Sequence, residues 1–419
     1  MTLDATGMNT LNVLDFGARP NSFEDDTAAF LEALKRQKKN DQTLFVPAGI
    51  YFISQPLNLF NTNLCGDGMM ATVIMSTCPD PLEPIVYAGR SVSIRDLTLA
   101  YKNELISKHE RQGERVGIRL HDREQIYGLQ RGSALRNIRI EQVGTAIYDP
   151  RVGLASHSVT FDTLEIINFS YRAFDFSSGH RIGHLFSNLF LASNMPDVDA
   201  VFHFEGEDST LTLHQITVLQ TKCRCVFHLE DVRGLSASTV YIQDVELRQP
   251  GDSFLSLVRS SAQLDELAIW FSTFTPTSAL IRLGDAGFEH SPHRENALRI
   301  GHLQLKGMND PTDQRKTAPR GVHDYRDKGY LFFDRSAEAE GEYTVEVSDY
   351  AWCAYQQDDA FYDEMPRDPC GRIHFIALGR LPLGGSAEQR PVNRLCPYAT
   401  RYFDTDMGRE LIWDGETWR

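Results

Sequence analysis

The sequence has little positive charge relative to its negative charge, no long apolar run and few cysteines. Its 419 residues include 42 Lys and Arg against 57 Asp and Glu, which gives a net charge of -15. Binding to duplex nucleic acid needs a surplus of positive charge to displace counterions, so the composition argues against a nucleic-acid partner and against a membrane surface. No stretch of about 18 apolar residues is present, so we expect no membrane-spanning helix.

The N-terminus and the cysteines point to synthesis in a reducing compartment. The first residues, MTLDATGMNTLNVLDFGA, have neither the basic nor the apolar region of a signal peptide. The seven cysteines are scattered and odd in number. Cys223 and Cys225 lie on one face of an expected strand, but no second pair completes a zinc site. We therefore expect reduced thiols, no bound metal, and synthesis in the cytoplasm without a signal peptide.

A pattern of six residues recurs along the chain: apolar, any, polar, apolar, any, apolar. The copies begin at Ile94, Leu135, Phe161, Phe186, Leu213, Ile242, Leu264 and Ile300. Most are followed by a second short strand of alternating residues, such as Ala173–Phe176 or Val201–Phe204. Short alternating strands cannot bury their apolar faces alone, whereas stacked coils can, and no helical periodicity fills the gaps. The pattern predicts an all-β fold, a right-handed, single-stranded parallel β-helix.

The two ends of the chain differ from this repeat. We expect a strand over residues 11–16, followed by a helix from Asp26 or Thr27 to about Arg36 that covers the open end of the β-helix. A polar, charged stretch from Tyr101 to Arg115 is expected to leave one coil as a long loop. The predicted parts are an N-terminal strand and capping helix (1–53), the parallel β-helix (54–306), a linker (307–328) and a small C-terminal β-rich module (329–419).

The N-terminal segment resembles that of the pectate-lyase-like superfamily, also called polygalacturonase-related. The matching motifs are Asp15-Phe-Gly-Ala18, the stretch EDDTAAFLEA from Glu24 to Ala33, Val46-Pro-Ala-Gly-Ile-Tyr51, and LCGDG from Leu64 to Gly68. These are cap and turn residues, so the resemblance specifies the fold rather than the chemistry. The superfamily includes glycosidases, polysaccharide lyases and bacteriophage tailspike depolymerases. The resemblance implies a homotrimer that acts on a polysaccharide, either outside the cell or as a virion tail component.

Alternation within the second strands brings polar side chains to one outward column. The column consists of Tyr148, Asp175, His203, His228, Ser256 and Arg282, with Ser177, Glu205 and Glu230 two residues further along. Glycosidases use two carboxylates about 5–10 Å apart, and neighbouring strands are about 5 Å apart. Crowded carboxylates raise one another's pKa, as a general acid requires. We predict Asp175, Glu205 and Glu230 as catalytic acid and base, with His203, His228 and Arg282 contacting the substrate.

Other interpretations of this column remain open. It also fits a solvated polar face or a subunit interface, which would make the chain a non-catalytic glycan-binding or structural tail module. A third possibility is a polysaccharide lyase, for which the resemblance implies a basic catalytic residue and Ca²⁺ held by clustered Asp. No Asp triplet occurs at the spacing of the coils. The leading prediction is a glycoside hydrolase or depolymerase acting on a bacterial or plant polysaccharide, with no cofactor.

Overall fold

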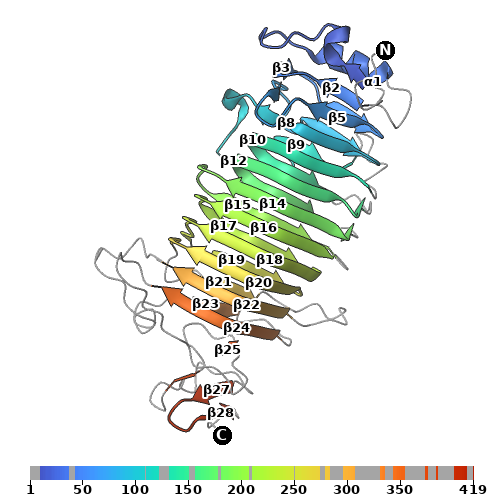
Figure 1. Ribbon diagram of the computed structural model, residues 1–419. Helices are drawn as coiled ribbons and strands as arrows, with labels where there is room; N and C mark the ends of the chain where they lie inside the picture. The colour runs from blue at the N-terminus through green and yellow to red at the C-terminus, as the bar shows by residue number, and fades with distance from the viewer. Residues whose placement is uncertain are drawn as a thin grey trace. The chain divides into compact units, whose positions relative to one another are not determined.

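The computed structural model describes residues 10–36, 43–108, 110–121, 132–150, 156–177, 181–206, 210–249, 251–273, 279–283, 296–306, 331–335, 343–353, 373–375, 384–385, 401–412 and 419. The chain divides into two compact units, residues 1–217 and 218–419. Each unit is built mainly of short parallel strands that stack into a β-solenoid (Figure 1). The predicted fold class is therefore confirmed. Within the described ranges, no helix has the length and apolar character needed to cross a membrane.

The chain enters the solenoid through a short strand and a helix. Strand β1 (Thr10–Asn12) pairs in parallel with β2 (Thr43–Val46). The strand expected to reach Phe16 ends earlier: residues Val13–Phe16 form a 3-10 helix, because the Asn12 side chain accepts a hydrogen bond from the Leu14 N–H. Helix α1 (Thr27–Arg36) lies where the sequence predicted it, and its Phe30 is fully buried with its ring edge-on to that of Tyr51.

The strands of the first unit follow the predicted repeat. They are β3 (Gly49–Ile53), β4 (Leu57–Phe60), β5 (Asn63–Gly66), β6 (Thr72–Ser76), β7 (Val86–Gly89), β8 (Ser93–Tyr101), β9 (Val116–Arg119), β10 (Ala134–Asp149), β11 (Ser156–His157), β12 (Thr160–Ser177), β13 (Arg181–Ile182), β14 (His184–Ala192) and β15 (Val198–Glu205), with β16 (Leu211–Leu219) at the boundary. Strands β8, β10, β12 and β14 stack in parallel, with the first residue of each repeat copy in register.

The polar third position of the repeat marks a bend in the backbone. Asp96, Asn137, Thr163 and Asn188 occupy this position, with φ of 61°, 52°, 54° and 54°. Asn and Asp tolerate this left-handed conformation better than other non-glycine residues. The bend residues also bond to one another, since Asn137 Nδ2 donates to Asp96 Oδ1 at 2.7 Å. The pattern that identified the repeat is thus a backbone requirement as well as a hydrophobic one.

The second unit continues the same architecture. Its strands are β17 (Cys223–Glu230), β18 (Arg233–Gln243), β19 (Ser253–Val258), β20 (Ser261–Trp270), β21 (Ala279–Leu283), β22 (Asn296–Lys306), β23 (Leu331–Arg335), β24 (Tyr343–Cys353), β25 (Ile373–Phe375), β26 (Gly384–Gly385), β27 (Arg401–Asp404) and β28 (Arg409–Ile412). Strands β23 and β24 pair in parallel with β21 and β22, so parallel pairing continues beyond the predicted limit at residue 306. The predicted linker over 307–328 lies outside the described residues.

The core of the first unit contains a ladder of phenylalanines. The rings of Phe174 and Phe202 are stacked with centroids 5.2 Å apart and planes 4° apart, and both side chains are fully buried. Phe161 and Phe186 stack in the same way at 4.7 Å. The phenylalanine side chains point into the core, as alternation predicted. Asp175 and His203, which directly follow Phe174 and Phe202 in the sequence, are therefore on the opposite face of their strands.

Candidate functional site

Three strands of the first unit bring Tyr148, Asp175 and His203 into one column. Tyr148 on β10 lies opposite Asp175 on β12, and Asp175 lies opposite His203 on β15. Two residues further along, Ser177 lies opposite Glu205. Alternation and strand register, as read from the sequence, are both observed within this unit.

Asp175 is the centre of a buried hydrogen-bond network. Its Oδ1 accepts from Arg172 Nη1 at 2.8 Å and from Ser177 Oγ at 2.9 Å, and His203 Nδ1 lies 3.2 Å away. The other carboxylate oxygen is buried and has no hydrogen-bond partner among the described residues. Asp175 is 0% exposed, so the outward column is enclosed here and is not a solvated face.

The charge state of Asp175 follows from two opposing effects. Burial raises its pKa, but the interaction with His203 and the positive charge of Arg172 outweigh burial and hold the pKa below its usual value. The carboxylate is therefore ionised at neutral pH. An ionised carboxylate beside Nδ1 of a histidine favours a proton on that nitrogen and leaves Nε2 as the basic one.

Arg172 was not predicted as part of the site. Its Nε donates to Asp199 Oδ2 at 2.7 Å, and its guanidinium lies 4.6 Å from the centre of the Tyr171 ring. Regular alternation assigns Arg172 and Asp175, three residues apart, to opposite faces, which is why the sequence did not reveal the pair. The pairing of β12 with β10 is irregular just before Arg172. Arg172 thus links two carboxylates and secures Asp175.

Tyr148 has a cationic neighbour on the preceding strand. Arg119 on β9 lies opposite Tyr148, with its guanidinium carbon 5.3 Å from the centre of the ring. Burial, and to a lesser extent the charge of Asp175, raise the pKa of Tyr148, so its hydroxyl stays protonated at neutral pH. The sequence placed Tyr148 in the column but gave it no role, and it gave no signal for Arg119.

The loop predicted over Tyr101–Arg115 folds back over this column. Gln112 Nε2 donates to Ser177 Oγ at 2.5 Å, and Arg119 Nη2 donates to the carbonyl of Gly113 at 3.1 Å. We call residues 102–115 the strap. Its contacts explain why a column that points outward from the strands is nevertheless buried.

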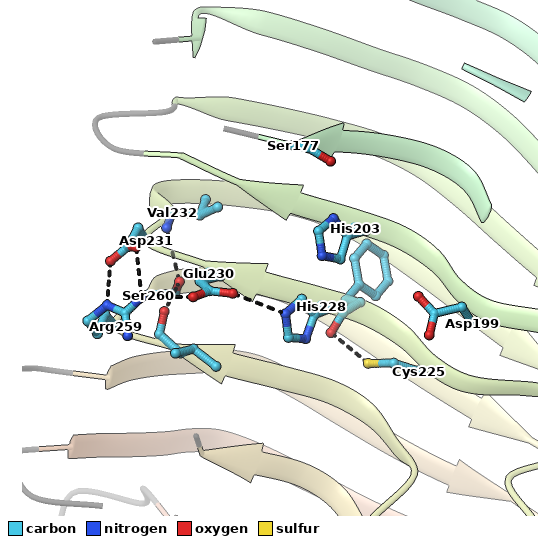
Figure 2. A network of polar contacts seen from close by, with 12 residues as sticks. Ser177, Asp199, His203, Cys225, His228, Glu230, Asp231, Val232, Arg259 and Ser260 are labelled. Carbon is cyan, nitrogen blue, oxygen red and sulfur yellow. Dashed lines mark hydrogen bonds and ion pairs between the residues drawn. The ribbon is translucent and has the colours of Figure 1, made fainter. Parts of the chain in front are cut away.

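In the second unit, Glu230 is held by an arginine. Its Oε1 accepts from Arg259 Nη2 at 2.9 Å, and His228 Nε2 lies 3.8 Å from its Oε2 (Figure 2). Arg259 also binds both oxygens of Asp231, at 2.6 and 2.8 Å. His228 and Arg259 lower the pKa of Glu230 to about 2. The Arg259 contact is the closer of the two, and Arg259 itself was missed by the sequence analysis.

The remaining predicted residue of the second unit, Arg282, packs against the chain. It lies opposite Ser256, which in turn lies opposite His228. The guanidinium of Arg282 lies against Gly251, whose φ is 93°. A Cβ added to Gly251 would come within 2.8 Å of Arg282 Nη1, so the glycine leaves room for this side chain. The predicted order of the column is therefore also observed in this unit.

The predicted electrostatics differ from those observed. Crowding was expected to raise the pKa of the carboxylates, but the pKa values of Asp175 and Glu230 are both lowered, because each carboxylate interacts with a histidine and with an arginine. Neither has the protonated form that a general acid needs at neutral pH. In the described part of the chain, no three His, Cys, Asp or Glu side chains are grouped in a way that could hold a metal ion.

Comparisons with known proteins gave one family match and several similar solved structures. Residues 10–78 match the family described as rhamnogalacturonase A/epimerase, pectate lyase-like. The chain is similar to the A-module of the Azotobacter vinelandii mannuronan C-5 epimerase AlgE6 (15% identity, 82% of this chain and 100% of that one, TM-score 0.41). It is also similar to an Acinetobacter phage tailspike (13%, 87% and 65%, 0.41) and to the catalytic unit of a Streptomyces thermodiastaticus α-1,3-glucanase (14%, 83% and 70%, 0.39).

These likenesses concern the fold alone, and no curated protein matches the sequence. The match over residues 10–78 covers the N-terminal motifs that suggested the resemblance, and the strands that follow form the expected solenoid. The family match is thus confined to residues 10–78, and beyond them the parallel strands show a β-solenoid fold. The residues of the column lie outside the matched segment, so their function has to be argued from their own geometry.

Proposed function

We propose that the chain is a polysaccharide-processing enzyme and that its chemistry takes place at Tyr148, Asp175 and His203. The observation that supports this most is the ionised, fully buried carboxylate of Asp175, 3.2 Å from His203 Nδ1. Burying a charge costs several kcal/mol unless it is well paired. A carboxylate this close to one ring nitrogen favours a proton there and leaves the other ring nitrogen to accept one.

The reaction that this set of groups suits best is elimination at a uronic acid residue. Nε2 of His203 takes the proton from the sugar carbon next to the carboxylate, and the electron pair becomes a carbon–carbon double bond. The bond from the adjacent carbon to the glycosidic oxygen breaks, and that oxygen receives the hydroxyl proton of Tyr148. Arg119, which lies over Tyr148, offers a positive charge for the substrate carboxylate.

Elimination is favoured over the predicted hydrolysis by the charge states. Hydrolysis with two carboxylates requires one of them to be protonated at the working pH. The histidine and the arginine beside each of Asp175 and Glu230 oppose this at both positions. In elimination, the protonated Tyr148 supplies the acid and His203 supplies the base, so no protonated carboxylate is needed.

The test is to incubate the protein with polygalacturonate, alginate and rhamnogalacturonan and to follow ultraviolet absorbance of unsaturated uronate together with new reducing ends. Elimination should give both in equal number. His203→Gln and Asp175→Asn should each reduce the rate by at least about a hundredfold, whereas Glu230→Gln should leave it nearly unchanged. Reducing ends without absorbance would indicate hydrolysis, and full activity of His203→Gln would remove this column from the mechanism.

A non-catalytic glycan-binding module is the second candidate. It is favoured by the complete burial of Asp175, whose hydrogen bonds all come from protein groups. Such a network also serves simply to stabilise a fold. Binding of a polysaccharide with no product of either kind would support this candidate over the enzyme.

A further inference from the structure

The strap is firmly anchored at its C-terminal end. The guanidinium of Arg115 is buried and donates to the carbonyls of Cys78 and Pro79 at 2.6 and 2.9 Å. The Arg115 carbonyl accepts from the Gly144 N–H at 2.9 Å, which joins this end of the strap to β10. These three hydrogen bonds of Arg115 fix the strap to the solenoid, as in a structural element rather than an unattached loop.

The middle of the strap packs closely on the coil that carries Tyr148. Glu110 is 9% exposed and packs against Gly144 of β10. A Cβ added to Gly144 would lie 3.0 Å from the Cβ of Glu110. Gly113 is buried with φ of 79°, and a Cβ there would lie 3.4 Å from the Tyr148 ring. The left-handed φ favours a glycine at this position, while the distance to the ring is an ordinary van der Waals contact.

Gln112 extends the strap to the next coil. It is exposed, yet its amide donates to Ser177 Oγ at 2.5 Å, and Ser177 in turn donates to Asp175 Oδ1 at 2.9 Å. The strap therefore crosses the coil of Tyr148 and reaches that of Asp175. On the side of Arg119, the column is covered by the strap backbone, to which Arg119 itself donates a hydrogen bond.

We infer that the strap closes one end of the substrate path, so that the site accepts the end of a polysaccharide chain rather than an internal segment. This inference rests on the proposed function, because it supposes that the substrate lies along the column of Tyr148, Asp175 and His203. A polysaccharide bound along the column would collide with Gly113 and Gln112 of the strap if it continued beyond Tyr148. An end-acting site needs no such passage.

The inference can be tested by binding alone, using the His203→Gln variant so that no substrate is consumed. Polygalacturonate, alginate and rhamnogalacturonan would each be prepared as two fractions of different chain length and titrated at equal mass. Binding to chain ends predicts saturation at a constant number of protein molecules per chain. The longer fraction should then bind fewer protein molecules per gram, in inverse proportion to its length.

Wild-type activity supplies the second readout. An end-acting enzyme should release short products from the start, with viscosity falling slowly for each bond broken. Gln112→Ala removes the contact with Ser177 and should increase internal cleavage about fivefold, the effect of one lost hydrogen bond on the equilibrium between a closed and an open strap. Lys108→Ala, an exposed position on the same strap, is the matched control and should leave the product pattern unchanged.

The outcomes separate the two proposals. Saturation proportional to polysaccharide mass, or an early collapse of viscosity with the wild-type protein, would overturn the inference about the strap while leaving the proposed function intact. No binding to any of the three polysaccharides would overturn the proposed function, and the inference with it. Binding at a constant number of protein molecules per polysaccharide chain, with no product, would support the inference about the strap. It would also mean that the column binds the polysaccharide without cleaving it.

Discussion

The carboxylate of Glu230, which contacts His228 and Arg259, should make a pH-dependent contribution to stability. His228 and Arg259 together lower the pKa of Glu230 from 4.5 to about 2, which corresponds to about 3 kcal/mol. The Glu230 side chain is 34% exposed, and solvent screens such a pair, so we expect about 1–2 kcal/mol. Glu230→Gln should lower the free energy of unfolding at pH 7 by this amount.

The sign of the pH dependence follows from the lowered pKa. Because the folded protein holds this carboxylate ionised, the contribution is fully present above the unfolded pKa of about 4.5 and is lost as the pH falls toward 2. At about pH 3.5, roughly two-fifths of it should be gone. The measurement is denaturant unfolding of the wild type and of Glu230→Gln at pH 7, 4.5 and 3.5, with tryptophan fluorescence as the probe.

A control variant distinguishes this pair from surface charge in general. Glu24 forms an ion pair with Arg19 in which the side chains are 67% and 72% exposed, so Glu24→Gln should change stability by no more than about 0.5 kcal/mol. If the difference between wild type and Glu230→Gln stayed constant from pH 7 to about pH 3.5, the lowered pKa would not be its cause. A difference no larger than that of the control would refute the reasoning outright.

Three further substitutions test the packing and the backbone, each by denaturant unfolding. Phe202→Ala should cost about 3–5 kcal/mol because it removes a fully buried ring from the ladder, and a loss close to that of Phe190→Ala, at a 38% exposed position, would contradict this. Thr163→Asn should stabilise the protein by about 1 kcal/mol, since a β-branched residue is strained at φ of 54°; destabilisation would show that the threonine is favoured there. Asp175→Asn should cost about 3 kcal/mol because it leaves Arg172 with one carboxylate fewer, and a neutral effect would mean that the buried pair adds no net stability.

The strand register was predictable because it depends on local rules. Alternation with a period of two determines which residues face the core, and the distance between repeat copies determines which residues lie opposite each other. Asp175 and His203 were placed on neighbouring strands by these rules alone, as were His228 and Ser256. The same rules did not predict that the solenoid continues beyond residue 306. Strands β23 and β24 come after a long stretch without the six-residue repeat, although they pair with β21 and β22.

The environment of the site was not predictable from those rules. Alternation says that Asp175 points away from the core, but it gives no sign that Gln112, 63 residues earlier in the chain, bonds to Ser177 beside it. The lowered pKa of Glu230 is in part of similar origin: His228 was placed beside it by alternation, but Arg259 contacts it from a turn in which the φ of Arg259 is 49°. Contacts made by loops and irregular turns have no periodicity, so a single sequence gives them no signal.

The stacking of the coils also has a consequence for how the chain folds and how it unfolds under force. Most strands pair with partners only about two dozen to three dozen residues away, such as Phe161 with Phe186 and Ser261 with Ala297. Each coil then depends on its immediate neighbours, as in other linear repeat proteins. A growing solenoid can add one coil after another as the chain emerges from the ribosome, and each new coil is a template for the next. Force applied along the axis should conversely detach the coils singly, in a series of small steps rather than in one cooperative rupture.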